Sequence, residues 1–146
     1  QVLLNGKNVN GVIRTEEVGN MASVVSAYPA VRAKLVELQR QLAAKSDVIM
    51  DGRDIGTCVL PDAQVKIYLT ASSATRAKRR FDELTAKGTV CDLAAIERDI
   101  IDRDYRDMHR ETSPLKQAED AVLVDSSKMD IDEVVDAIYQ IYREAV

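Results

Sequence analysis

The stretch SDVIMDGRDIGT, residues 46–57, decides how the rest of the chain is interpreted. Its apolar residues from Val48 to Met50 predict a short strand, which ends in the charged sequence DGRD. A simple turn needs only an Asp-Gly pair. Arg53 and Asp54 add opposite charges at a strand end, where ligands bind in open α/β sheets. The stretch is therefore either a solvated turn with an internal salt bridge or part of a ligand site.

The pattern of apolar residues beyond this stretch predicts an α/β fold. Strands are expected in AQVKIYLT, residues 63–70, and in DAVLVDSS, residues 120–127, the second one buried. Helices are expected from Thr15, from Pro29 to about Lys45, from Ser73 to about Ala86, over 92–110, and after Asp130. Strands separated by helices predict a parallel sheet with helices on both faces. Residues 2–14, with two Asn-Gly pairs, predict a hairpin appended to it.

The composition argues against several classes of function. A chain of 146 residues can form about one domain, and its net charge of −4 with one Phe and no Trp disfavours nucleic-acid binding. Cys58, Cys91 and His109 are isolated, so neither a metal site nor a disulfide framework is expected. No membrane span or signal peptide is apparent, so we expect a soluble, cytoplasmic chain.

The helix expected over 92–110 carries charged residues on its inward face. Its apolar positions continue, at 100° per residue, into Arg103, Asp107 and Arg110. A surface pair between Arg103 and Asp107 would contribute only a few tenths of a kcal/mol. The alternative is a forked cationic surface that faces a cleft and suits phosphate oxygens.

A second basic cluster lies on the preceding helix and consists of Arg76, Lys78, Arg79 and Arg80. Two basic helices on either side of a glycine-containing loop resemble a flap over an anion. Ordinary surface charge is the alternative for each of these residues.

Five stretches occur in order and at fitting intervals: IRTEEV (13–18), AYPAVR (27–32), DGRDIGT (51–57), PDAQVKIYLTASSATRAKRR (61–80) and RDYRDMHR (103–110). With them the chain resembles the bacterial cytidylate kinases, a family of nucleoside monophosphate kinases, over essentially all of its length. The resemblance implies a P-loop kinase-like fold. It also implies transfer of the γ-phosphoryl group of ATP to CMP or dCMP, giving (d)CDP and ADP, with Mg²⁺ on the ATP phosphates. The full-length protein is expected to be a monomer that binds neither nucleic acid nor membranes.

The resemblance also implies residues that recognise the base and residues of a lid. Ser23 and Arg32 match positions that contact the cytosine, and Asp54 matches the carboxylate that accepts a hydrogen bond from the cytosine amino group. Arg79 and Arg80 match a mobile lid on the ATP side. Ser23 could instead be a solvated helix serine, and Arg32 a residue on the flank of its helix.

The remaining implied positions surround the acceptor phosphate and the ribose. Arg53 and Arg110 match arginines on the CMP phosphate, while Arg103 and Asp107 match residues near the ribose. Arg103 also reaches the phosphates when the site closes, so Arg53, Arg103 and Arg110 are the expected catalytic residues. Such a reaction needs positioning and charge neutralisation rather than a side-chain nucleophile.

The chain departs from the family pattern in one respect. No G-x-x-x-x-G-K-[S/T] phosphate loop occurs, since NGKNVNG at 5–11 has the letters but not the order. We therefore expect a C-terminal fragment that lacks the first strand, phosphate loop and helix and is inactive alone. Its expected parts are a piece of the monophosphate-binding insertion (1–28), core (29–75), an Arg-rich lid region (76–110) and core again (111–146).

The sequence leaves three alternatives to a cytidylate kinase. A kinase of another nucleoside monophosphate, such as UMP or AMP, would share the architecture and differ in its base pocket. A non-catalytic nucleotide-binding module would fit a chain without a phosphate loop. A structural protein is disfavoured, because inward-facing arginines are costly without an anion to pair with.

Overall fold

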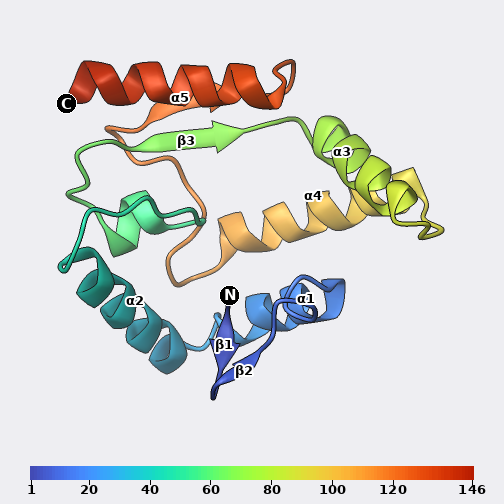
Figure 1. Ribbon diagram of the computed structural model, residues 1–146, viewed down its shortest axis with the longest axis horizontal. Helices are drawn as coiled ribbons and strands as arrows, with labels where there is room; N and C mark the ends of the chain where they lie inside the picture. The colour runs from blue at the N-terminus through green and yellow to red at the C-terminus, as the bar shows by residue number, and fades with distance from the viewer. The chain divides into compact units, whose positions relative to one another are not determined.

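The computed structural model describes residues 1–146 except the side chain of Glu16. The chain divides into two compact units, Gln1–Val48 and Ile49–Val146 (Figure 1). The first unit contains a hairpin and two helices, and the second contains a parallel pair of strands with three α-helices. The cavity described below belongs to the second unit.

The first unit opens with the hairpin that the sequence predicts. Strands β1 (Leu3–Leu4) and β2 (Lys7–Asn8) pair antiparallel, and Asn5 and Gly6 form the turn between them. Both turn residues have positive φ, +50° and +78°. Asn-Gly pairs adopt this conformation readily, and it matches the twist of a two-residue hairpin.

Two helices follow the hairpin at the predicted positions. Helix α1 (Glu16–Val25) begins after Thr15, whose side chain accepts a hydrogen bond from the Val18 amide. Helix α2 (Pro29–Ala43) begins at a proline, which suits a first turn whose amides have no partner within the helix.

The second unit has an α/β architecture, as the sequence predicts. Its elements are β3 (Ile67–Thr70), α3 (Ser73–Ala86), α4 (Leu93–His109), β4 (Val122–Asp125) and α5 (Ile131–Ala145), with a π-helical turn η1 (Ile55–Val59) before them. Strands β3 and β4 pair in parallel, with Ile67 opposite Val122 and Thr70 opposite Asp125. In Figure 1, α5 and α4 lie on opposite sides of this pair.

Helix boundaries in this unit follow from local capping. Asp92 precedes α4 and accepts hydrogen bonds from the amides of Ala94 and Ala95. Asp130 and Glu133 form the predicted capping box at the start of α5. These contacts satisfy amides that have no partner inside the helix, so the helices begin where short polar side chains occur.

Predictions for the strands were less accurate. Residues 48–50 form no strand, and Ile49 is fully exposed. A strand requires a neighbour for its backbone, and β3 and β4 pair only with each other among residues 1–146. The strands also cover fewer residues than 63–70 and 120–127, and only Val124 of β4 is buried. With two strands and few covering helices, the other side chains of β4 stay exposed, so the expected buried strand was wrong.

Buried polar side chains mark the region around the site. Asp54, Asp107 and Ser126 are nearly inaccessible in the second unit, alongside small apolar residues such as Val59 and Ala77. A charged group is buried at low cost only when it is paired and hydrogen-bonded. The partners of these carboxylates therefore show how the site is built.

Candidate functional site

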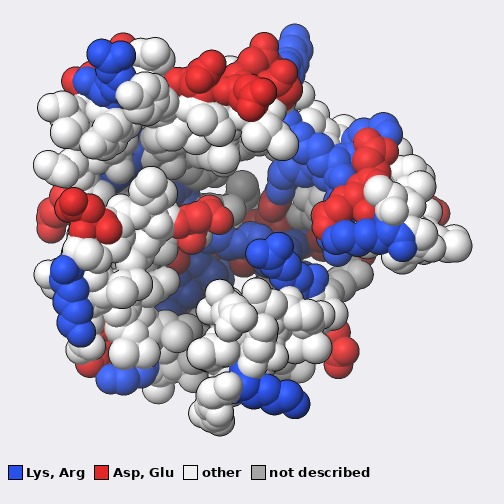
Figure 2. All heavy atoms as spheres, in the orientation of Figure 1, with Lys and Arg blue, Asp and Glu red and all other residues white. Residues whose placement is uncertain are grey.

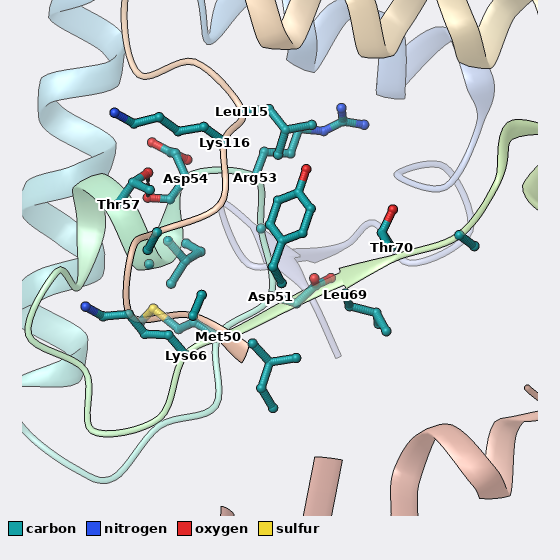
Figure 3. Close-up of a pocket in the computed structure, with 18 of the residues that line it drawn as sticks. Met50, Asp51, Arg53, Asp54, Thr57, Lys66, Leu69, Thr70, Leu115 and Lys116 are labelled. Atoms are coloured by element: carbon teal, nitrogen blue, oxygen red, sulfur yellow. Dashed lines mark hydrogen bonds between the residues drawn. The ribbon is translucent and has the colours of Figure 1, made fainter. Parts of the chain in front are cut away.

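A hollow of about 610 Å³ lies in the second unit. Its wall combines the turn at residues 50–57, strand β3, parts of α3 and α4, and the segment that follows α4. In Figure 3, Arg53 and Asp54 from the turn lie around the same space as Leu115 and Lys116 from that segment. The charged turn is thus part of a cavity rather than an isolated surface feature.

Asp107 of α4 joins the turn to the end of the helix. Its side chain is 5% exposed, accepts a hydrogen bond from Arg53 Nη1, and lies 3.8 Å from Arg110 Nη1. Its backbone carbonyl accepts a hydrogen bond from the Leu115 amide at 2.8 Å. One buried carboxylate therefore orients two guanidinium groups that are far apart in the sequence.

The surface pair between Arg103 and Asp107 is not formed within the part of the chain that the structure describes. Arg103 instead keeps a buried Nε without a hydrogen-bond partner among the described atoms. A buried donor without a partner is costly in a folded protein. An oxygen-bearing ligand would remove this cost.

The arginines of the site act on one another electrostatically. Burial and the nearby guanidinium of Arg103 lower the pKa of Arg53, and Arg110 and Arg76 act in the same direction. Asp104 opposes this shift. Three guanidinium groups thus lie within electrostatic reach of Arg53, and Arg53 and Arg76 line the cavity, an arrangement that suits an anion with several oxygen atoms.

Arg79 and Arg80, the two predicted lid residues on α3, have different partners. Arg79 donates hydrogen bonds to the carbonyl oxygens of Ser126 and Met129, at 2.7 and 3.1 Å, and lines the cavity. Arg80 instead pairs with the exposed Glu83 on its own helix. Of the two predicted lid residues, Arg79 is thus anchored to the chain after β4, while the ion pair of Arg80 stays within α3.

One ion pair of the cavity wall involves residues that were not among the predicted site residues. Arg76 and Asp104 form an ion pair between α3 and α4 and both line the cavity. Arg76 belonged to the basic cluster of the sequence, which gave a weak signal. Asp104 follows Ile100 by four residues and precedes Asp107 by three, so helical periodicity places it on the same face as the charged stripe, and this signal was overlooked.

Ser23 and Arg32 belong to the first unit and lie near each other there. Arg32 is buried and donates a hydrogen bond from Nη1 to the Ser26 carbonyl at 3.4 Å. The Ser26 hydroxyl in turn donates to the Ser23 carbonyl at 3.0 Å. Ser26 thus links the end of α1 to the first turn of α2, where both predicted residues lie.

Neither a metal cluster nor a membrane span was found in the described residues. They include no group of three or more His, Cys, Asp or Glu side chains that could hold a metal ion. None of the protein's described helices is both long and apolar enough to cross a membrane.

An arginine-lined cavity beside a parallel α/β unit is typical of proteins that bind phosphate-bearing ligands. The cytidylate kinase family model matches residues 1–144. A cytidylate kinase from Lactobacillus gasseri is 56% identical over 144 residues, which cover 99% of this chain and 63% of the relative. A cytidylate kinase from Geobacillus sp. is 49% identical over 145 residues, covering 99% of this chain and 65% of the relative. The chain belongs to the cytidylate kinase family, and it spans just under two thirds of the length of these relatives.

Proposed function

We propose that the protein transfers the γ-phosphoryl group of ATP to CMP or dCMP, giving (d)CDP and ADP. The observation that carries the proposal is the pair of guanidinium groups, Arg53 and Arg110, next to the buried carboxylate of Asp107, with Arg53 lining the cavity. Relatives that are half identical in sequence are named cytidylate kinase, which supports the same acceptor.

The acceptor phosphate would be bound by Arg53 and Arg110, with Arg103 supplying a further donor. A phosphate oxygen of CMP attacks the γ-phosphorus of ATP, and the bond from that phosphorus to the β,γ-bridging oxygen breaks, so ADP leaves. No side-chain nucleophile takes part. The arginines align the attacking oxygen and offset the charge that spreads over the transferred group.

Recognition of the base and ribose is proposed for the other predicted residues. Asp54 would accept a hydrogen bond from the cytosine amino group, and Ser23 and Arg32 would contact the same base. Asp107 would contact the ribose. Support comes from the burial of Asp54, Arg32 and Asp107, since buried polar side chains can discriminate strongly between ligands.

The ATP side is proposed to involve Arg79 and Arg80, with Mg²⁺ carried on the ATP phosphates. Holding those phosphates in P-loop kinases also requires a glycine-rich loop with a lysine. No G-x-x-x-x-G-K-[S/T] sequence occurs in residues 1–146, so we propose that these residues alone do not turn over ATP. We further propose that the protein is a cytoplasmic monomer. We also propose that it does not bind nucleic acid, which is supported by the net charge of −4 and the few aromatic residues.

The test is ADP formation by the whole protein with CMP, dCMP, UMP and AMP as acceptors. We expect CMP and dCMP to give the highest specificity constants. A preference for UMP or AMP would contradict the cytosine assignment. If calorimetry detects no binding of CMP and ADP does not form with any acceptor, a non-catalytic role is favoured instead.

A further inference from the structure

The ion pair between Arg76 and Asp104 lies in the cavity wall. Arg76 Nη1 donates to Asp104 Oδ1 at 3.1 Å, and Nη2 donates to Oδ2. Arg76 Nε donates to the carbonyl of Ala71 at 3.0 Å. The guanidinium is therefore held on two edges, by the end of the β3 segment and by α4, in the fork geometry that gives arginine pairs their directionality.

Asp104 also acts on the arginine of the turn. Its charge raises the pKa of Arg53, against the combined lowering by burial, Arg103, Arg110 and Arg76. Its hydrogen bond raises the pKa of Arg76. Asp104 is thus an anionic group of the cavity wall in electrostatic reach of Arg53 and Arg76, arginines from two different elements.

This pair differs from the other ion pairs of α3. Figure 2 shows basic and acidic side chains interleaved over this helix, and the pair formed by Lys78 and Asp82 is more than half exposed on both sides. Exposed pairs of this kind contribute little to stability. The Asp104 side chain is 22% exposed, binds with both oxygens and lines the cavity.

The packing of α3 on α4 has a second polar link. The Ser73 hydroxyl donates to Glu97 Oε1 at 2.9 Å, and Ala77 is fully buried on the inner side of α3. The two helices are therefore not held together by Asp104 alone. Its position at the cavity indicates a role toward whatever binds there.

We propose that Asp104 is a positioning residue of the acceptor-phosphate site. Its carboxylate holds Arg76 in the cavity wall and offsets the repulsion among the arginines until a phosphate group supplies negative charge. The inference rests on the proposed function, in that the phosphate is that of the acceptor nucleotide. When the phosphate binds, the anion and Asp104 share the same arginines, so the site stays ordered both with and without its ligand.

The test measures the melting temperatures of wild type and variants with and without inorganic phosphate. Sodium chloride at the same ionic strength serves as the control for nonspecific salt effects. Asp104→Asn should melt lower than wild type in phosphate-free buffer and recover with phosphate, because the anion replaces the lost charge. Its affinity for phosphate should rise on the order of tenfold, the scale of one close charge. Asp102→Asn, an exposed neighbour on α4, is the matched control and should behave as wild type.

The substitution Arg76→Gln, which replaces the other member of the ion pair, gives a second test of the proposal. The freed carboxylate of Asp104 remains near Arg53 and competes with the anion, so the phosphate-induced rise in melting temperature should be smaller than in wild type. If phosphate raises the melting temperature of wild type and of Asp104→Asn equally, the proposal is overturned. Asp104 would then only link α3 to α4. If Asp104→Asn does not fold, a rise in Arg76→Gln that equals or exceeds that of wild type overturns it.

A parallel series with CMP separates this inference from the proposed function. If CMP raises the melting temperature of wild type no more than inorganic phosphate does, the nucleotide assignment is contradicted. The ordering of the variants with phosphate still decides the role of Asp104 in that case.

Discussion

Arg53, which lines the cavity, and Asp107 are 54 residues apart in the sequence and form a hydrogen-bonded ion pair. Asp107 is nearly inaccessible, whereas the Arg53 side chain is 35% exposed. The pair therefore holds the arginine from its buried side and leaves part of its guanidinium toward the cavity. This arrangement suits a donor that must be in place before an anionic ligand arrives.

Replacing Asp107 tests whether this carboxylate orders the site. Asp107→Asn removes the charge that Arg53 and Arg110 share and leaves both cations near each other. We expect the free energy of unfolding to fall by about 1–3 kcal/mol, the cost of leaving a partly buried group without its partner. Urea denaturation measures it, with Asp102→Asn as the exposed control on the same helix. Equal stability of the two variants would mean that the pair does not organise the site.

Arg110→Ala should impair the use of CMP far more than the affinity for ATP. The side chain of Arg110 is 17% exposed and lies against Asp107, where an acceptor phosphate would bind. Loss of a hydrogen bond to a charged group costs about 1.5–3 kcal/mol, or roughly tenfold or more in the specificity constant. Steady-state kinetics of the whole protein with CMP and ATP varied separately measures both.

Arg106→Ala serves as the matched control for this variant, since Arg106 is exposed in the last turn of α4. If Arg110→Ala and Arg106→Ala have the same specificity constant for CMP, Arg110 is an ordinary helix residue.

Asp54→Asn should narrow the preference for CMP over UMP. Cytosine presents an amino donor where uracil presents a carbonyl acceptor, and a carboxylate can bind only the donor. The asparagine amide can donate to uracil, so the ratio of specificity constants should fall by roughly tenfold or more. If Asp54 only maintains the turn, both substrates suffer alike and the melting temperature falls. An unchanged ratio therefore argues against a role in reading the base.

Arg79→Lys tests whether Arg79 stabilises the fold or belongs to a lid that acts on ATP. Arg79 Nη2 donates to the carbonyls of Ser126 and Met129, and Nη1 donates to the Ser126 hydroxyl at 3.3 Å. A lysine has a single nitrogen and cannot place donors at both positions. We expect a loss of about 1 kcal/mol in stability, measured by thermal unfolding, from the hydrogen bond that is lost. Arg80→Lys keeps the exposed pair with Glu83 and should leave stability unchanged. A change in ATP use by Arg79→Lys without any change in stability would instead favour the lid role.

Local sequence signals predicted the helices well. Helix α3 has the predicted bounds, and α4 is flanked by Asp92 and Arg110, the predicted limits of its segment. Capping depends on residues a few positions apart, so it can be recognised in a sequence. The prediction of a strand at residues 48–50 was wrong because strand formation depends on a partner that is distant in the sequence.

The candidate site could be predicted only in part. Helical periodicity placed Arg103, Asp107 and Arg110 on one face, and Asp107 and Arg110 do lie together. The pairing of Asp107 with Arg53 is a tertiary contact that no spacing rule reveals. Asp104 was missed because its role depends on where α3 packs, which brings Arg76 to it.

A crystal structure of the protein with CMP would show directly whether Arg53 and Arg110 bind the acceptor phosphate. We predict the phosphate oxygens within hydrogen-bond distance of both guanidinium groups, with roughly 2.7–2.9 Å between the charged partners. The cytosine amino group should donate to Asp54. A CMP phosphate bound away from both arginines, with the pair between Arg53 and Asp107 unchanged, would show that these arginines do not form the acceptor site.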